Sequence, residues 1–214
     1  MEFRLLYSGA LPPQSRGGGG HIDTKHHIRK QIHRQLRELW QHHPYLTSYF
    51  GVLPGVTRKL IVPTARDDEP TTRLDFIARN FTKYGFRFIP LISNEFGTGC
   101  SVDILFLRRD DPGNLIVESV DGGDIDNRIK TLWDALQVPH YNQDLGFGKF
   151  KPEEGEDPFF VLLENDNLIT EVKVTTDRLL TPVEQGEGIK DVHIVMHVKT
   201  KIVDYQKAPS IFAH

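Results

Sequence analysis

Two aspartates one residue apart, Asp124 and Asp126, stand at the start of a predicted helix, directly after the flexible pair Gly122-Gly123. Carboxylates this close repel each other unless a positive charge lies between them. Oxygen ligands of this kind suit a hard divalent cation such as Mg²⁺ or Mn²⁺. Lys130 follows Asp126 by one helical turn. The stretch could therefore bind a metal ion beside a fixed positive charge.

The helix that begins here has the periodicity of an amphipathic helix. Its apolar residues recur at helical spacing and predict one buried face, formed by Ile125, Ile129, Leu132, Trp133 and Leu136. Asp126, Lys130 and Asp134 follow at four-residue intervals on the neighbouring face. From the spacing alone, a purely structural interpretation is also open. Asp124 would then cap the helix, Asp126 would favour the helix dipole, and Asp126 would form a surface ion pair with Lys130.

The other elements predict a single mixed α/β (α+β) domain over residues 1–214, with a largely antiparallel sheet and two to three helices. Helical spacing predicts helices at 24–42 and 70–84. Apolar runs and alternation predict strands at 3–7, 86–92, 101–108, 115–117, 159–163, 168–175 and 192–198. Pro90 interrupts one of these strands, so we expect that strand at an edge or a bulge.

Two stretches look like additions to a smaller domain. Residues 44–98 are predicted as an insertion, because the first part of this range is rich in proline, glycine and turn signals. Residues 138–158 are predicted as a long loop, polar and with several acids.

Composition limits the class of protein. The chain has 214 residues, a formal net charge of −3 and one cysteine, Cys100. One cysteine excludes an internal disulfide and fits a reducing compartment. The N-terminus lacks the apolar run of a signal peptide, and no stretch approaches the roughly 20 apolar residues of a membrane helix. We therefore expect a cytoplasmic protein with no membrane partner.

Positive charge is concentrated near the N-terminus, against the net balance. Six cations are predicted to contact nucleic-acid phosphates: Arg16, Lys25, Arg29, Lys30, Arg34 and Arg37. On the helix at 24–42, the apolar residues Ile28, Ile32, Leu36, Leu39 and Trp40 predict the buried face, while Arg29, Lys30, His33, Arg34 and Arg37 are expected on the surface. The alternative is an ordinary solvated face. The glycines at 17–20 are a surface loop or one that orders over a substrate backbone. Zinc is disfavoured at the two His-His pairs, because adjacent residues point to different sides of a helix.

The central motif also resembles a known family. Asp124-Ile125-Asp126-Asn127-x-x-Lys130-x-x-x-Asp134-Ala135-Leu136 resembles the signature of the RusA family of Holliday-junction resolvases, in which a D-x-D-N-x-x-K helix is followed by D-A-L. A later aspartate precedes a strand in that family. Asp166 matches it, within Glu164-Asn165-Asp166-Asn167-Leu168-Ile169. The segment Leu11-Pro12-Pro13-Gln14-Ser15-Arg16 is similar to the start of such proteins, so the resemblance covers the first strand and roughly residues 100–205.

The resemblance implies a RusA-like fold and a Mg²⁺- or Mn²⁺-dependent endodeoxyribonuclease that cuts four-way DNA junctions as a homodimer. It implies Asp124, Asp126 and Asp166 as metal ligands and Lys130 as the catalytic lysine. Asn127 and Asp134 are interpreted as supporting the fold or the metal ligands. The chain is longer than typical members and more acidic than many junction binders. Two alternatives therefore stay open: action on other branched or single-stranded nucleic acid, including RNA, and a non-catalytic nucleic-acid-binding protein on the same scaffold.

Overall fold

A computed structural model of the chain describes residues 1–14, 21–50, 72–109, 125–140, 146, 148–182 and 191–207. Its helices are α1 (Ile22–His42), α3 (Arg73–Asn80) and α4 (Ile125–Leu136), with short 3₁₀ helices η1 (Thr47–Phe50) and η4 (Asp166–Leu168). Its strands are β1 (Glu2–Gly9), β2 (Thr82–Lys83), β3 (Phe86–Ile92), β4 (Thr98–Arg108), β5 (Phe159–Leu163), β6 (Ile169–Arg178) and β7 (Val192–Ile202). The predicted strand at 115–117 lies outside the described residues.

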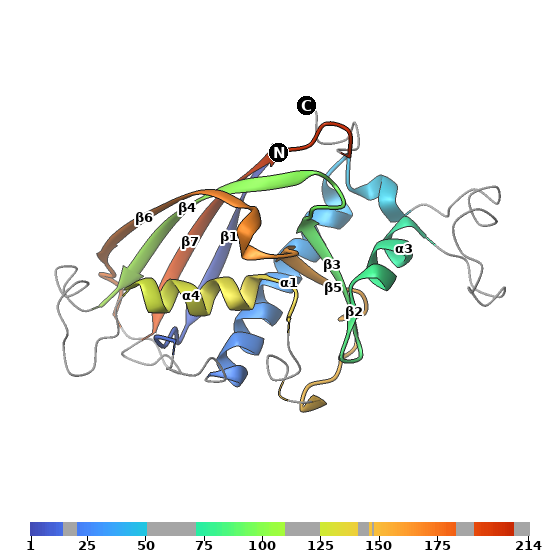
Figure 1. The fold of residues 1–214 in the computed structure, drawn as a ribbon. Coiled ribbons are helices and arrows are strands. Elements are labelled where there is room, and N and C mark those ends of the chain that lie inside the picture. The colour runs from blue at the N-terminus through green and yellow to red at the C-terminus, as the bar shows by residue number, and fades with distance from the viewer. Residues whose placement is uncertain are drawn as a thin grey trace.

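The larger sheet has the strand order β1-β7-β4-β6. β7 pairs antiparallel with both β1 and β4, whereas β6 runs parallel to β4. The predicted alternation in β4 is confirmed, since Val102, Ile104 and Phe106 are all buried. Because parallel strands need a crossover connection, α4 lies between β4 and β6 in the chain and runs across one face of this sheet (Figure 1).

A second, three-stranded sheet has the order β2-β3-β5. It joins the predicted insertion to the strand at 159–163, because β3 pairs in parallel with β5. β2 pairs with β3 only at Phe86 and Arg87. In the described part of the chain, Pro90 therefore faces no strand on that side, which explains how a residue without an N–H is accommodated.

Helix α1 connects the two sheets, since it packs against β1, β5 and α4 (Figure 1). Its apolar stripe is buried as predicted at Ile28, Ile32, Leu36 and Trp40. The predicted fold class is confirmed as mixed α/β with three α-helices among the described residues. The strands form two sheets, and both β5 and β6 add parallel pairings to the antiparallel ones.

Two helix boundaries differ from prediction. α1 begins after His21, whose side chain makes no capping bond, and Asp23 lies in the first turn. α3 begins at a capping box formed by Thr72 and Asp75 and ends at Asn80. The chain cannot stay helical to residue 84, because Tyr84 and Gly85 have φ values of 54° and 88° and form the β2–β3 turn. None of the described helices has both the length and the apolar character needed to cross a membrane.

Candidate functional site

The first turn of α4 is held by the segment that follows β1. The backbone N–H of Gln14 donates to the carbonyl of Asn127 at 2.9 Å. Arg128 donates from Nη1 to the carbonyl of Leu11 at 2.6 Å. The structure thus brings together two of the segments on which the RusA resemblance rests, the Pro-Pro segment and the aspartate motif. Arg16 and Asp124 lie outside the described residues.

Asp126 and Lys130 form an ion pair on the exposed side of α4, with Nζ and Oδ2 separated by 2.6 Å. Their side chains are 62% and 50% exposed. An exposed pair of this kind contributes little to stability because both charges are well solvated. The fold therefore does not depend on the pair, and the Asp126 carboxylate is accessible to a ligand from solvent.

Asp134, two turns further along α4, has different surroundings. Its carboxylate accepts from Lys25 Nζ at 2.7 Å and from Gln14 Nε2 at 3.2 Å. Its backbone carbonyl accepts from Arg29 Nη2 at 3.1 Å. Lys25 is only 2% exposed, so this is a largely buried charge pair. Asp134 therefore joins α4 to α1 and to the segment that also holds the first turn of the motif helix.

Asp166 lies at the opposite end of α4. Its backbone N–H donates to the side-chain oxygen of Gln137 at 3.0 Å, and Gln137 directly follows the last residue of α4. Asp126 is in the first turn, eleven positions earlier. At about 1.5 Å per residue, the two ends are roughly 16 Å apart along the helix axis.

This separation does not fit the expected cluster within one chain. Oxygens that share a single cation lie within about 5 Å of one another. The described residues contain no group of three or more histidine, cysteine or acidic side chains placed to hold a metal ion. Asp126 and Asp166 of one chain are therefore too far apart to bind the same ion. Asp124, the third predicted ligand, lies outside the described residues, so the metal site formed by the three aspartates stays a prediction.

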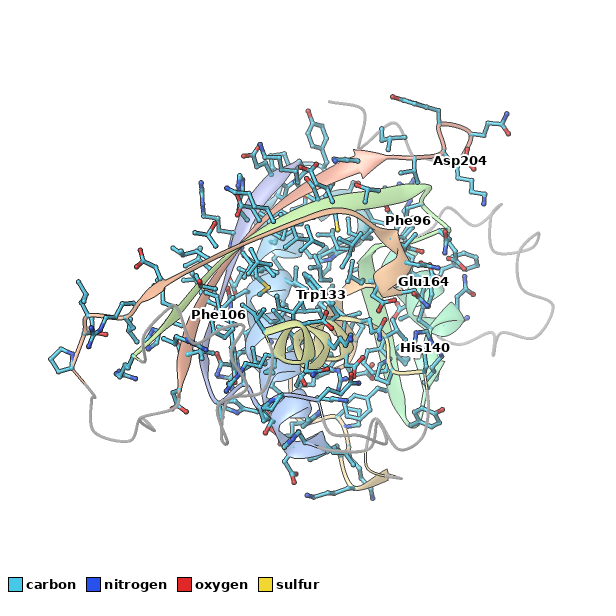
Figure 2. All side chains as sticks on the ribbon, turned by 60° about the vertical axis from the view of Figure 1, so that its left-hand side comes forward. Phe96, Phe106, Trp133, His140, Glu164 and Asp204 are labelled. Carbon is cyan, nitrogen blue, oxygen red and sulfur yellow. The ribbon has the colours of Figure 1, made fainter. Side chains whose placement is uncertain are left out.

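The turn that carries Asp166 is well anchored. Asn165 contacts His140, with Nδ2 and Nε2 separated by 3.1 Å, and its side-chain oxygen accepts from the N–H of Asn167. Glu164 accepts from Ser93 Oγ at 2.7 Å. Figure 2 shows Glu164 and His140 on the same side of the molecule, where this turn lies. Gln137 and His140 were missed at the sequence level. Their only local signal is that they follow the D-A-L of the motif.

The predicted phosphate-binding cations of α1 are mostly engaged inside the protein. Lys25 and Arg29 are 2% and 1% exposed. Lys30 pairs with Glu153 at 2.6 Å and with Glu156 at 3.1 Å. Arg37 donates to the carbonyl of Gly155 at 3.2 Å.

The prediction that Arg29 and His33 lie on the surface is therefore wrong, because both are buried. α1 is covered from two sides, by α4 and by β5 together with the loop before it. Burial alone would lower the pKa of Lys30, but its bonds with Glu153 and Glu156 raise that pKa above its ordinary value. Arg34 is the member of the predicted set that stays exposed among the described residues.

The two buried histidines of α1 are neutral packing groups. His26 stacks on Phe150, with ring centroids 4.0 Å apart, and burial lowers its pKa to about 4. His33 accepts from the N–H of Phe160 at Nδ1 and contacts the carbonyl of Gly155 through Nε2. The first contact assigns the ring proton to Nε2. Burial also lowers the pKa of His33.

Comparisons of the chain with protein-family models, with curated proteins and with solved structures found no match. The resemblance to the RusA family therefore rests on the motif residues themselves.

Proposed function

We propose that the chain is a metal-dependent endonuclease of the RusA type that hydrolyses phosphodiesters in branched DNA as a homodimer. The observation that carries the proposal is the exposed Asp126–Lys130 pair at the start of α4. It belongs to a motif whose spacing resembles that of the family. The neighbouring Leu11-to-Gln14 segment, also part of the resemblance, contacts the same turn.

The dimer is part of the chemistry, because one copy cannot bring its own aspartates together. Asp126 and Asp166 lie at opposite ends of α4. A site that includes all three predicted ligands must therefore combine Asp124 and Asp126 of one copy with Asp166 of the other. A two-fold dimer then contains two such composite sites.

Each residue has a defined task in this proposal. The carboxylates of Asp124, Asp126 and Asp166 would hold Mg²⁺ or Mn²⁺, for which oxygen ligands are suited. The bound ion would polarise the phosphate and acidify a water molecule. Lys130 would turn from Asp126 to the phosphate and neutralise charge that develops on its oxygens. Asp134 and Asn127 would keep the first turn of α4 in place through Lys25 and Gln14.

The substrate is tested with a panel of four-way junction, fork, single strand and duplex under Mg²⁺ and under chelator. We expect Asp126→Asn to reduce cleavage of branched DNA by about two orders of magnitude or more, with binding in metal-free buffer unchanged. Glu38→Gln is the matched control, because Glu38 is an exposed acid on α1. Wild-type cleavage by Asp126→Asn refutes the site. Equal cutting of plain duplex refutes the preference for branched DNA.

The composite site is tested by mixing two inactive variants. A heterodimer of Asp126→Asn with Asp166→Asn chains has one site with both substitutions and one site with neither. Random mixing should therefore restore about a quarter of the wild-type cleavage. If the ligands came from one chain, every site would carry one substitution and the mixture would stay inactive.

The alternative of a non-catalytic nucleic-acid-binding protein has one observation in its favour. The described residues of one copy contain no group of three or more histidine, cysteine or acidic side chains placed to hold a metal ion. Binding of DNA without cleavage of any substrate, and without heat on titration of Mn²⁺, would establish it.

A further inference from the structure

The two edges of the four-stranded sheet are treated differently by the rest of the chain. At the β1 edge, the side chain of Gln35 bonds both the N–H and the carbonyl of Leu6, at 2.8 and 2.7 Å. Gln31 makes the same pair of contacts with Ser8. Two side-chain amides of α1 therefore satisfy backbone groups that an edge strand leaves unpaired.

The β6 edge has no comparable cover in the part of the chain that the structure describes. β6 is ten residues long and contains no proline, and among the described strands it pairs with β4 alone. The pairing is regular except for one shift at its start, between Cys100 and Ser101. Figure 1 shows β6 as the outermost strand on this side. A long, regular edge of this kind is a template for pairing with another strand.

The side chains of β6 also extend the apolar core face of the four-stranded sheet beyond the part that is buried. Val172 lies opposite Val102 of β4 and so shares the core face of the sheet. Val102 is buried, whereas Val172 is 47% exposed. Trp133 of α4 and Val174 are only partly buried against the core. The core face therefore runs out to the edge and ends in apolar groups that contact solvent.

We propose that β6 pairs antiparallel with β6 of a second copy of this chain, about a two-fold axis through Val172. The axis must pass through a residue, because residues opposite each other in one sheet point to the same face. This register places Val172 against itself. It also places Glu171 opposite Lys173 of the second copy, twice by symmetry.

The neighbouring registers are less favourable. An axis through Lys173 puts two ammonium groups opposite each other, and an axis through Val174 puts Glu171 opposite Asp177. An axis through Thr175 pairs Lys173 with Asp177, but it leaves Val172 opposite Arg178. The Val172 register is the one that combines an apolar centre with opposite charges on both sides. It extends the ion pairs already present, Lys173 with Asp103 and Lys201 with Glu171.

This interface also meets the geometric need of the proposed function, on which this one consequence rests. The register places Asp166 alongside Arg178 of the second copy, at the carboxyl end of its β6. The start of α4, with Asp126, lies toward that same end of the sheet, because α4 runs back toward the strand starts (Figure 1). Residues at opposite ends of one chain therefore approach each other across the axis.

The test measures mass in solution by light scattering and sedimentation at micromolar concentration, without reference to nuclease activity. The wild type should have the mass of two chains. Val172→Lys should raise the dissociation constant at least about 100-fold, because two lysines would face each other at the axis. Leu6→Lys is the matched control, since Leu6 is 56% exposed on the other edge strand and should leave the dimer intact. Far-UV circular dichroism should stay unchanged in both variants, which shows that each still folds.

Cross-linking tests the register. Residues opposite themselves lie within the range of a disulfide, and the native Cys100 is buried. Val172→Cys should form a disulfide-linked dimer under mild oxidation, and Thr175→Cys should not. A monomeric wild type, a dimeric Val172→Lys protein or cross-linking through residue 175 in place of 172 would overturn the proposal. An intact, β6-linked dimer that cuts no nucleic acid would instead refute the proposed function and leave the interface standing.

Discussion

The stability of the fold should fall in mild acid, because His26 is buried in a place that does not accept a second proton. Its ring stacks on Phe150 and lies edge-on to Phe86. Its Nδ1 is buried and has no hydrogen-bond partner among the described residues. Burial, reinforced by the nearby cation of Arg29 and opposed by Glu156, lowers the pKa of His26 to about 4.

The sign of the effect follows from the two pKa values. An unfolded histidine titrates near 6.5, so between pH 6.5 and 4 the unfolded chain binds a proton that the folded chain does not. Acid therefore favours unfolding. The stabilisation is complete above pH 6.5 and is lost as the pH falls through this window. At about 1.4 kcal/mol per pKa unit, the full loss is about 3 kcal/mol, of which about 2 kcal/mol occurs between pH 7.5 and pH 5.

The assay is urea unfolding followed by circular dichroism at these two pH values, with the free energy of unfolding from linear extrapolation. His26→Phe keeps an aromatic ring against Phe150 but cannot be protonated. We expect this variant to lose about 2 kcal/mol less than the wild type between the two pH values. His42→Phe, at an exposed position on the same helix, should lose as much as the wild type. An equal loss in His26→Phe and wild type would refute the argument.

Two further stability predictions test other contacts. Asp134→Asn leaves the ammonium of Lys25 buried without its charge partner, so it should destabilise the fold by about 3 kcal/mol in urea unfolding. The double change Lys25→Met with Asp134→Leu removes both charges and should destabilise the fold clearly less. An equal or greater loss would refute the argument that Asp134→Asn acts by leaving the Lys25 charge buried without a partner. Gly97→Ala should lower the free energy of unfolding by about 1–2 kcal/mol, since Gly97 has φ 58° and an added Cβ would meet the Asp204 carbonyl. Gly85→Ala, at φ 88° with open space around it, should cost less; the reverse order would refute the clash.

Local patterns in the sequence predicted α4 and β4 well, because the burial of their side chains follows the simple periodicity of the element itself. In α4, helical spacing identified Ile129, Leu132 and Leu136, all of which are buried. In β4, alternation identified the core face. The ion pair between Asp126 and Lys130 is also local, since one helical turn separates the two residues.

The polar face of α1 could not be predicted in the same way, because its neighbours come from distant parts of the chain. Lys25 finds its acid at Asp134, 109 positions later. His33 bonds to Phe160, 127 positions later. Periodicity identifies one apolar stripe, but it does not show that a second element covers the charged flank. Two of the cations assigned to nucleic acid from sequence, Lys25 and Arg29, therefore became interior contacts.

The position of Asp166 follows from topology, and it explains why the proposed metal site needs a second chain. α4 connects two parallel strands, so it runs against their direction and begins near the carboxyl end of β4. A residue just before β6 lies at the amino end of that sheet. A motif at the helix start and an aspartate before the next parallel strand are thus separated by the length of the helix. Antiparallel pairing of two β6 edges reverses one sheet relative to the other and brings the amino end of one beside the carboxyl end of its mate. The three aspartates can act together if the free edge of β6 is where the two copies join.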